Sequence, residues 1–251
     1  MWYCCLLLVP MGHALRGDSA AGSPINLQAI APSLRDGSLA SSSIAGDSHN
    51  AWLLDRAAKT IYNLSPTPGS AKRSFRVEMP EPTALAYDGK LLLVTDQQQK
   101  MLYFFDPADG RGVRRVPLPM PEDKGSGLIA AISWDGTSLW SAISAGQSSS
   151  FNQINLERNA VVRSLFANCD PRGLAVSGSQ LWSLCYNGKW LPALIVSHDL
   201  SSKRNAEIEM TARPLATPGA NQLQGLYYDG VGHLFSIDLV NTRPISVAVS
   251  P

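Results

Sequence analysis

The chain of 251 residues is poor in charge and lacks the motifs of the commonest enzyme classes. Charged residues make up 16% of it, below the roughly 25% of a typical soluble chain. The net charge of +1 creates no field that would attract nucleic acid, so no nucleic-acid partner is expected. The patterns G-x-x-x-x-G-K-[ST], G-x-G-x-x-G, H-E-x-x-H, C-x-x-C and G-x-S-x-G are all absent. The sequence therefore offers no support for a nucleotide-binding, zinc-peptidase or serine-hydrolase function.

Long hydrophobic runs are also missing, and the one continuous apolar block, Trp2–Val9, is far too short to span a bilayer. Stable membrane insertion is therefore not expected. Residues 1–22 read either as a signal peptide cleaved after Ala14 or Ala21, or as a disordered tail, since no Lys or Arg precedes the apolar block. The first reading predicts a periplasmic or secreted protein, with residues 23–251 forming a single domain.

What the chain does contain is a run of short strands separated by tight turns. Between Pro82 and Pro119, apolar segments rich in β-branched and aromatic residues alternate with Asp-Gly and Asp-Pro turns. Together with the polar turn after Asp96, these make three hairpin turns in under forty residues and predict a four-stranded antiparallel meander. A sheet of this kind cannot bury both faces alone, so it requires neighbours of the same kind.

The same unit recurs five times along the chain, as a turn followed by an apolar strand with an aromatic or Leu marker. The copies are Ser43–Asp55, Ala84–Asp96, Ala131–Ile143, Gly173–Cys185 and Gly225–Asp238. Their markers, Trp52, Leu93, Trp140, Trp182 and Phe235, lie 41 to 53 residues apart, close to the length of a propeller blade. The sequence thus predicts an all-β fold, a β-propeller of five four-stranded blades.

Third strands are expected in all five repeats and fourth strands in four of them. The third strands are predicted at Thr60–Leu64, Met101–Phe105, Phe151–Leu156, Ala193–Ser197 and Pro244–Val249. The fourth strands are predicted at Ser74–Met79, Val113–Leu118, Val161–Phe166 and Ala206–Met210. The fifth repeat has no fourth strand after it, while the strand-like run Pro24–Ala31 has no blade of its own. We therefore expect this N-terminal strand to close the last blade beside Pro244–Val249.

The segment PTALAYDGKLLLVTDQQQKMLYFFDPADG resembles the blades of NHL-type and related bacterial propellers. Their repeats follow a cadence of Gly-Leu-Ala-x-Asp-Gly, Leu-Trp-Val-x-Asp and Ile-Tyr-x-Leu-Asp-Pro. The resemblance covers residues 45–250 in five weak copies and concerns architecture. Members of this superfamily include binding scaffolds, lactonases with a channel metal, streptogramin-type lyases and five-bladed glutaminyl cyclases. The Phe-Gly-Glu-Gly and Asn-Glu-Leu-Glu segments expected of those cyclases are absent.

The residue that ends the second strand is an aspartate in three repeats: Asp55, Asp96 and Asp238. In a propeller these side chains share the face that also carries the connections between blades. If they converged near the axis, they could bind Ca²⁺ together with backbone carbonyls, because hard cations take several oxygen ligands. Alternatively, each carboxylate accepts hydrogen bonds from its own turn. Recurrence in blade after blade favours the local role, and no metal ligand is assigned.

The fourth repeat carries a second set of candidate ligand-binding residues. Asp170 and Arg172 lie on the connection that enters it, and Asn187 and Trp190 lie on the loop after its second strand. Aromatic faces with amide and guanidinium donors suit a small polar or sugar-like ligand, although Trp190 could equally pack the edge of the blade.

Cys169 and Cys185 lie at the same end of this repeat. A disulfide between them is conceivable and is the natural state if the chain is exported; otherwise both are buried thiols.

Two functions from different classes fit these observations. One is an exported binding module, acting as a monomer on a small polar ligand or a protein partner through the loop-rich face. The other is a propeller enzyme of the lyase, lactonase or glutaminyl-cyclotransferase type, using carboxylates and a metal such as Ca²⁺. The absence of a general-base signature and the repeated, structural character of the aspartates favour the binding module.

Overall fold

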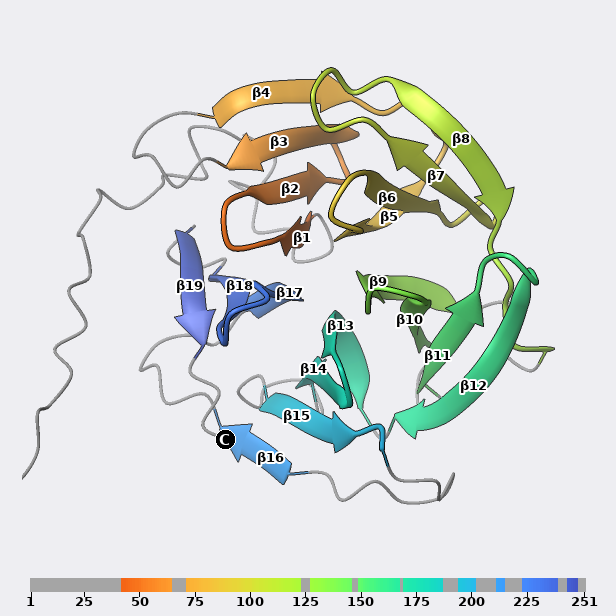
Figure 1. Ribbon diagram of the computed structural model, residues 1–251, viewed down its shortest axis with the longest axis vertical. Coiled ribbons are helices and arrows are strands. Elements are labelled where there is room, and N and C mark those ends of the chain that lie inside the picture. The colour runs from red at the N-terminus through yellow and green to blue at the C-terminus, as the bar shows by residue number, and fades with distance from the viewer. Residues whose placement is uncertain are drawn as a thin grey trace, which may run out of the picture.

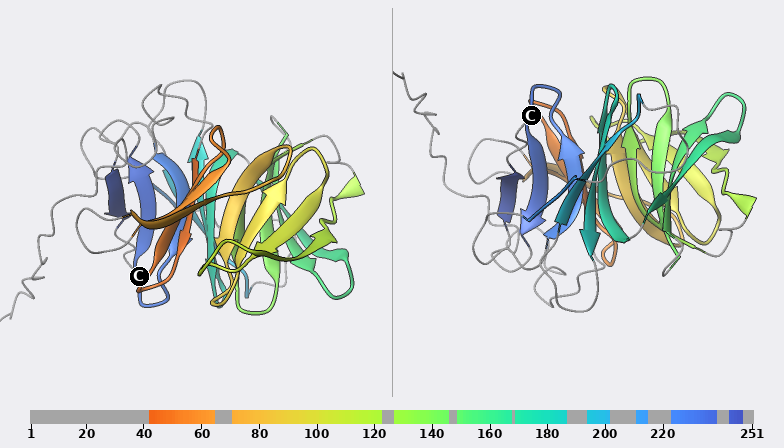
Figure 2. Two further views of the ribbon diagram at one scale, coloured as in Figure 1. Left: turned by 90° about the horizontal axis from the view of Figure 1, so that it is seen from above. Right: turned by 90° about the horizontal axis from the view of Figure 1, so that it is seen from below.

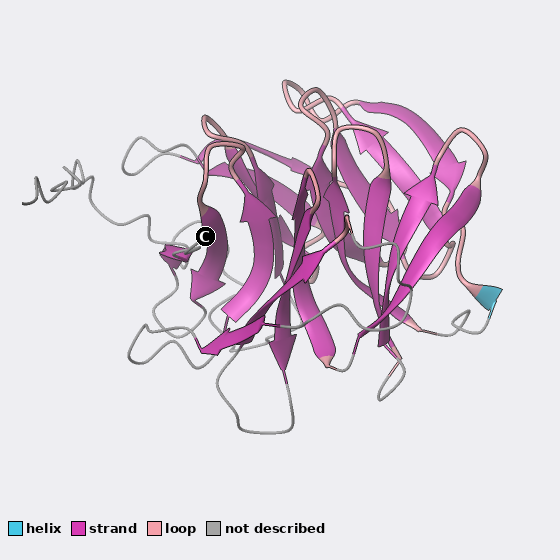
Figure 3. Ribbon diagram, turned by 60° about the horizontal axis from the view of Figure 1, so that its bottom comes forward, coloured by secondary structure: helices cyan, strands magenta, loops and turns pink. Residues whose placement is uncertain are grey.

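The computed structural model describes residues 42–64, 71–122, 127–145, 149–167, 169–186, 194–201, 211–214, 223–238 and 243–247. Five antiparallel sheets stand around a common axis, as Figure 1 shows. Strands dominate each blade, and the turns gather at its two ends (Figure 3). No helix in the described ranges is long and apolar enough to cross a membrane. The sequence-based prediction of an all-β propeller with five blades is confirmed.

Each blade follows the chain from the axis outward, so that consecutive strands are neighbours. Blade 1 consists of β1 (Ser42–Gly46), β2 (Ala51–Asp55), β3 (Thr60–Leu64) and β4 (Ala71–Arg76). Blade 2 consists of β5 (Pro82–Tyr87), β6 (Leu92–Asp96), β7 (Met101–Phe105) and β8 (Gly112–Pro117). Blade 3 consists of β9 (Leu128–Trp134), β10 (Leu139–Ser144), β11 (Ser149–Asn155) and β12 (Ala160–Ala167). Blade 4 consists of β13 (Asp170–Ser177), β14 (Gln180–Tyr186), β15 (Leu194–Asp199) and β16 (Thr211–Pro214), and blade 5 of β17 (Leu223–Tyr228), β18 (Leu234–Asp238) and β19 (Arg243–Val247).

Two sequence predictions about outer strands need comment. In the described residues the fourth strand of blade 4 is Thr211–Pro214. The segment predicted for it, Ala206–Met210, lies outside the described residues. Thr211–Pro214 itself is a short run with little apolar pattern, which made it look like part of the next connection. Blade 5 has three strands among the described residues. The proposed closing strand, Pro24–Ala31, also lies outside them.

The five first strands form the innermost layer and contact one another in a closed ring. β1 contacts β5, β5 contacts β9, and the order continues through β13 and β17 back to β1. The side views in Figure 2 show the blades standing side by side along this ring. The described strands alone therefore bring the first and last blades together, whatever lies at the outer edge of blade 5.

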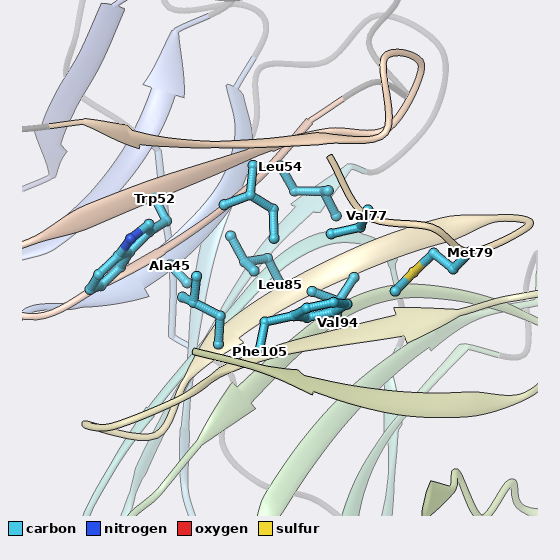
Figure 4. Packing of buried hydrophobic residues seen from close by; sticks show 10 residues of the cluster. Ala45, Trp52, Leu54, Val77, Met79, Leu85, Val94 and Phe105 are labelled. Carbon is cyan, nitrogen blue, oxygen red and sulfur yellow. The ribbon is translucent and has the colours of Figure 1, made fainter. Parts of the chain in front are cut away.

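The core consists of apolar side chains clamped between neighbouring blades. Between blades 1 and 2, Trp52 and Leu54 pack against Leu85, Val94 and Phe105 (Figure 4). Leu54 and Val94 are fully buried. Burying a side chain of this size contributes about 1.5–3 kcal/mol each, so a stack of such layers can stabilise the ring without long helices.

The four tryptophans of the repeat strands were all expected in this inter-blade core. Trp52, Trp140 and Trp182 are buried there as predicted. Trp134 is only partly buried: it packs against the cluster between blades 2 and 3 and also lines a small cavity on the axis. Trp134 is the last residue of the innermost strand β9 and lies beside the axis, which explains why it is less buried than the other three tryptophans.

Close approach of the innermost strands depends on glycine. A side chain at Gly173 of β13 would lie 2.6 Å from the backbone of Gly225 in β17. Gly225 itself has a positive φ of 69° and approaches Ile44 of β1. These two positions let blade 5 fit between its neighbours, because any larger residue would push the strands apart.

The titratable side chain of His198 is buried in this core. His198 of β15 is 2% exposed, and its ring lies edge-on to Phe151 of blade 3 with centroids 5.1 Å apart. Within the described residues its Nε2 atom has no hydrogen-bond partner. Burial lowers the pKa of His198 to about 4, so the folded protein holds this imidazole neutral.

This burial predicts acid sensitivity. Between about pH 6.5 and pH 4 the unfolded chain binds a proton at His198 that the folded chain does not, so the free energy of unfolding should fall by about 3 kcal/mol as the pH decreases. Replacing His198 with Leu should remove this part of the pH dependence, measured by urea unfolding across the range. The exposed His49, replaced in the same way, is the control. Equal pH dependence in wild type and His198→Leu would contradict the prediction.

Candidate functional site

We call the end of the ring where the second strands finish and the blades are joined the mouth face. Asp55, Asp96 and Asp238 all lie there and are almost completely buried. Asp55 accepts a hydrogen bond from the backbone N–H of Ala58 at 2.9 Å. Asp96 accepts from Gln99 at 2.8 Å through Oδ1 and from Glu81 at 3.1 Å through Oδ2. Asp55 and Asp96 therefore hold turns, which is the local role considered for this recurring aspartate.

No set of three or more His, Cys, Asp or Glu side chains that could hold a metal ion is found within the described residues. The hypothesised Ca²⁺ ring of Asp55, Asp96 and Asp238 therefore does not form in this part of the chain.

The residue that follows the predicted end of the second strand (Asp55, Asp96, Ile143 and Cys185) has a different role, which sequence reasoning missed. In four blades its side chain makes a hydrogen bond to the first strand of the next blade or to the residue just before that strand. The bonds are Arg56 Nε to the Pro82 carbonyl (3.2 Å), Gln97 Nε2 to the Gly127 carbonyl (2.9 Å), Ser144 Oγ to Asp170 Oδ1 (2.7 Å) and Tyr186 Oη to the Leu223 carbonyl (2.9 Å). The residue types differ, so only the position could have signalled this bridge.

Blade 4 gathers the most polar chemistry at the mouth face. The guanidinium of Arg172 donates to Asp170 Oδ2 at 2.7 Å and lies 6.0 Å from the ring centre of Tyr186. The side chains of Arg172 and Asp170 are 35% and 36% exposed, so solvent and ligands can reach them. Burial raises the pKa of the Tyr186 phenol, partly offset by the backbone of Leu223 and by Arg172. The phenol therefore stays protonated and bridges to blade 5.

A disulfide anchors this cluster. Cys169 and Cys185 are joined, with Cα atoms 5.5 Å apart. Asp170 and Tyr186, the next residues, are paired directly across β13 and β14. The covalent bond thus fixes the start of one strand to the end of the next beside the exposed Asp170–Arg172 pair.

A second arginine lies within electrostatic range of Arg172. Burial lowers the pKa of Arg56, Glu81 opposes this shift, and the charge of Arg172 lowers the pKa further. Arg56 belongs to blade 1 and Arg172 to blade 4, which are not neighbours in the ring. Arg56 was not among the sequence candidates, because only the fold brings it near Arg172.

Two predicted site residues, Asn187 and Trp190, lie outside the described residues. Among the others, the structure brings Asp170 and Arg172 together and leaves them partly exposed. Asp96 is completely buried, and its carboxylate accepts the N–H group of Gln99 in its own turn. The guanidinium group of Arg172, with the carboxylate of Asp170 beside it, can bind planar polar groups such as carboxylates and amides through paired hydrogen bonds.

Comparison with known proteins identifies the class. No family model matches the chain, and no curated protein matches it. Solved structures do, at low identity. The glutaminyl cyclase of Myxococcus xanthus aligns with a TM-score of 0.60 at 13% identity over 83% of this chain and 89% of that one. A nidogen/laminin complex aligns with a TM-score of 0.52 at 15% identity over 84% and 81%.

Hydrazine synthase of Kuenenia stuttgartiensis aligns with a TM-score of 0.52 at 15% identity, over 78% of this chain and only 55% of that one. All of these neighbours are β-propellers. At such identities the likeness concerns the fold alone, a β-propeller, and the activity of the chain must be argued from its own residues.

The disulfide gives a direct test of how this site is held. Replacing Cys169 and Cys185 together with Ala should lower the free energy of unfolding by about 3 kcal/mol, because the bond closes a loop with a sequence separation of 16. The measurement is denaturant unfolding without reductant. Peptide mapping by mass spectrometry before and after reduction shows whether the bond is present. An unreduced digest containing both cysteines as free thiols would contradict the assignment.

Proposed function

We propose that this propeller is an exported binding module whose ligand is a small polar molecule held over the channel mouth. The observation that carries the proposal is the partly exposed ion pair of Arg172 and Asp170 at the mouth face, near enough to Arg56 of blade 1 for the charge of Arg172 to act on it. Rigid strands position these side chains, and residues on a rigid scaffold make a precise site. Asn187 and Trp190, on the loop that follows Tyr186, complete the proposed contacts.

Export is supported by two independent features. The disulfide between Cys169 and Cys185 is typical of an oxidising compartment. The apolar block Trp2–Val9 has the length of a signal-peptide core. We propose a periplasmic or secreted monomer, with the blades of the NHL type that the Asp-Gly and Asp-Pro cadence resembles.

The enzymatic alternative is a lyase, lactonase or glutaminyl cyclotransferase with carboxylates at the mouth. The fold likeness to a glutaminyl cyclase is the observation in its favour. Against it, Asp55 and Asp96 are buried and occupied by turn hydrogen bonds. The binding module therefore fits the described residues better.

The ligand site can be tested by screening and substitution. We expect a panel of small carboxylates, amides and sugars, followed by ligand-observed NMR, to yield binders whose affinity falls at least about tenfold in Arg172→Ala, since hydrogen bonds to charged groups contribute about 1.5–3 kcal/mol. Stability should change little, because Arg172 is partly exposed. Arg115→Ala, on the exposed outer strand β8, is the matched control. Binders unaffected by Arg172→Ala would move the site elsewhere.

The same wild-type and variant proteins can be used to distinguish a binding module from an enzyme. A binding module gives no ammonia release from peptides with an N-terminal glutamine and no loss of ligand affinity after treatment with a chelator. Turnover that disappears in Arg172→Ala would favour the enzyme instead.

We also propose that Pro24–Ala31 completes blade 5 beside β19. The strand-like sequence of this run and the three-stranded sheet of blade 5 support the idea. Deleting residues 1–32 should lower the melting temperature cooperatively, because the outer edge of β19 loses its partner. Deleting only residues 1–22, which keeps the proposed strand, is the matched control and should melt like the full chain. Identical melting of both truncated proteins would contradict closure by this segment.

A further inference from the structure

At the mouth face, side chains reach from one blade to the next, and the joint between blades 3 and 4 differs from the other three described above. Those three side chains all donate to backbone carbonyls. Ser144 donates instead to a side chain, since its Oγ lies 2.7 Å from Oδ1 of Asp170. Any residue supplies a backbone carbonyl, whereas this bond requires an acceptor side chain at position 170. The joint therefore acts on Asp170 itself and not only on the contact between blades.

The position of Ser144 is set by the sheet of blade 3. It is the last residue of β10, is half-buried, and pairs with Leu128 of β9. β10 contacts β13, the first strand of blade 4, which begins at Asp170 (Figure 1). A side chain on a strand of a rigid scaffold is held more precisely than one on a loop. Blade 3 thus offers a fixed donor to the first residue of blade 4.

Asp170 is held at both of its carboxylate oxygens. Oδ1 accepts the hydroxyl of Ser144, and Oδ2 accepts Nη2 of Arg172 at 2.7 Å. Hydrogen bonds to an ionised group are shorter and roughly twice as strong as those between neutral groups. One donor on each oxygen, supplied by two different blades, fixes the rotation of the carboxylate. The fixed carboxylate in turn determines where the guanidinium of Arg172 points.

Arg172 stands at an irregularity of β13. Pro171 pairs with Cys185 and Gly173 with Leu184, so Arg172 is the extra residue of a β-bulge. Bulges redirect side chains and are frequent next to functional sites. Among the described residues the guanidinium forms hydrogen bonds through Nη2 alone, which leaves its other N–H groups for a ligand. The direction of those groups depends on the ion pair with Asp170.

We propose that Ser144 is a positioning residue of the ligand site at the mouth face. Its hydroxyl sets the orientation of Asp170, and Asp170 sets that of Arg172, which binds the ligand. This inference rests on the proposed function and places the site at the junction of blades 3 and 4, not within blade 4 alone. Ser144 belongs to no motif, and only the contact between blades brings it to Asp170, 26 residues further along the chain.

The first test needs no ligand. Phenylglyoxal modifies accessible arginines, and a guanidinium held by a carboxylate reacts more slowly than an unpaired one. We expect Arg172 in the full chain to react about threefold faster in Ser144→Ala than in wild type, because its carboxylate partner is no longer fixed. Ser144→Thr keeps the hydroxyl and should restore the wild-type rate. Peptide mass spectrometry measures the rate at each arginine, with Arg115 on the exposed strand β8 as internal reference.

Three further variants separate positioning from a general loosening of the ring. Gln97→Ala removes the joint between blades 2 and 3, where Gln97 bonds to Gly127 and Ile129, and should leave the rate at Arg172 unchanged. Asp170→Asn weakens the ion pair directly and should raise the rate at least as much as Ser144→Ala. Ser144→Val has the shape of the Thr variant without its hydroxyl, so it repeats the test if Ser144→Ala fails to fold.

The binding arm uses acetate as the probe, followed by ligand-observed NMR. The affinity for acetate should fall about threefold in Ser144→Ala and return in Ser144→Thr. Adding Ser144→Ala to Arg172→Ala should cause no further loss, because the serine acts only through the arginine. A purely structural role of Ser144 would give neither the recovery with Thr nor this lack of additivity.

The outcomes distinguish this inference from the proposed function. Equal rates at Arg172 in Ser144→Ala and Gln97→Ala would overturn the inference, as would an unchanged rate in Asp170→Asn. Acetate binding that depends on Arg172 but not on Ser144 would also overturn it and would leave the proposed ligand site standing. Acetate binding that is independent of Arg172 would overturn the ligand site itself, and with it the role of Ser144 there, even where the phenylglyoxal rates follow the expected order.

Discussion

Contact between neighbouring blades is the constraint on which the rest of this structure depends. No sheet of three or four strands can bury two apolar faces by itself, so each blade is stable only between two others. The ring of first strands satisfies this requirement for all five blades at once. Glycine at 173 and 225 lets the backbones approach at the blades where the chain must close on itself. Stability is consequently shared around the ring and not concentrated in one core.

Residues that recur in several blades have structural roles, and this distinguishes them from residues that occur in one blade only. The turn aspartates Asp47, Asp88, Asp135 and Asp229 all accept N–H groups from their own turns, and Asp55 and Asp96 do the same at the mouth face. A role repeated in several blades is best explained by what every blade needs. The functional candidates are instead the departures from the repeat. Arg172 and the disulfide each occur in one blade only among the described residues.

The two ends of the axis consequently differ in chemistry although they belong to one symmetrical scaffold. The ion pair of Asp170 and Arg172 lies at the mouth face, whereas the side chains of Tyr87, Trp134, Tyr227 and Tyr228 line the axial cavity at the other end.

The amino-acid sequence by itself determined the blade count and much of the strand pattern, because Asp-Gly turns and alternating apolar runs are local signals. Two third strands, Thr60–Leu64 and Met101–Phe105, were predicted to the residue. The weakly patterned strand Thr211–Pro214 was not, because its pairing with β15 rather than its composition makes it a strand.

Only the tertiary structure decided what meets at the axis. Ring closure brings Tyr227 to Gly46 across more than a hundred residues of sequence, and it brings Arg56 within electrostatic range of Arg172. A local pattern carries no information about a partner in a distant blade.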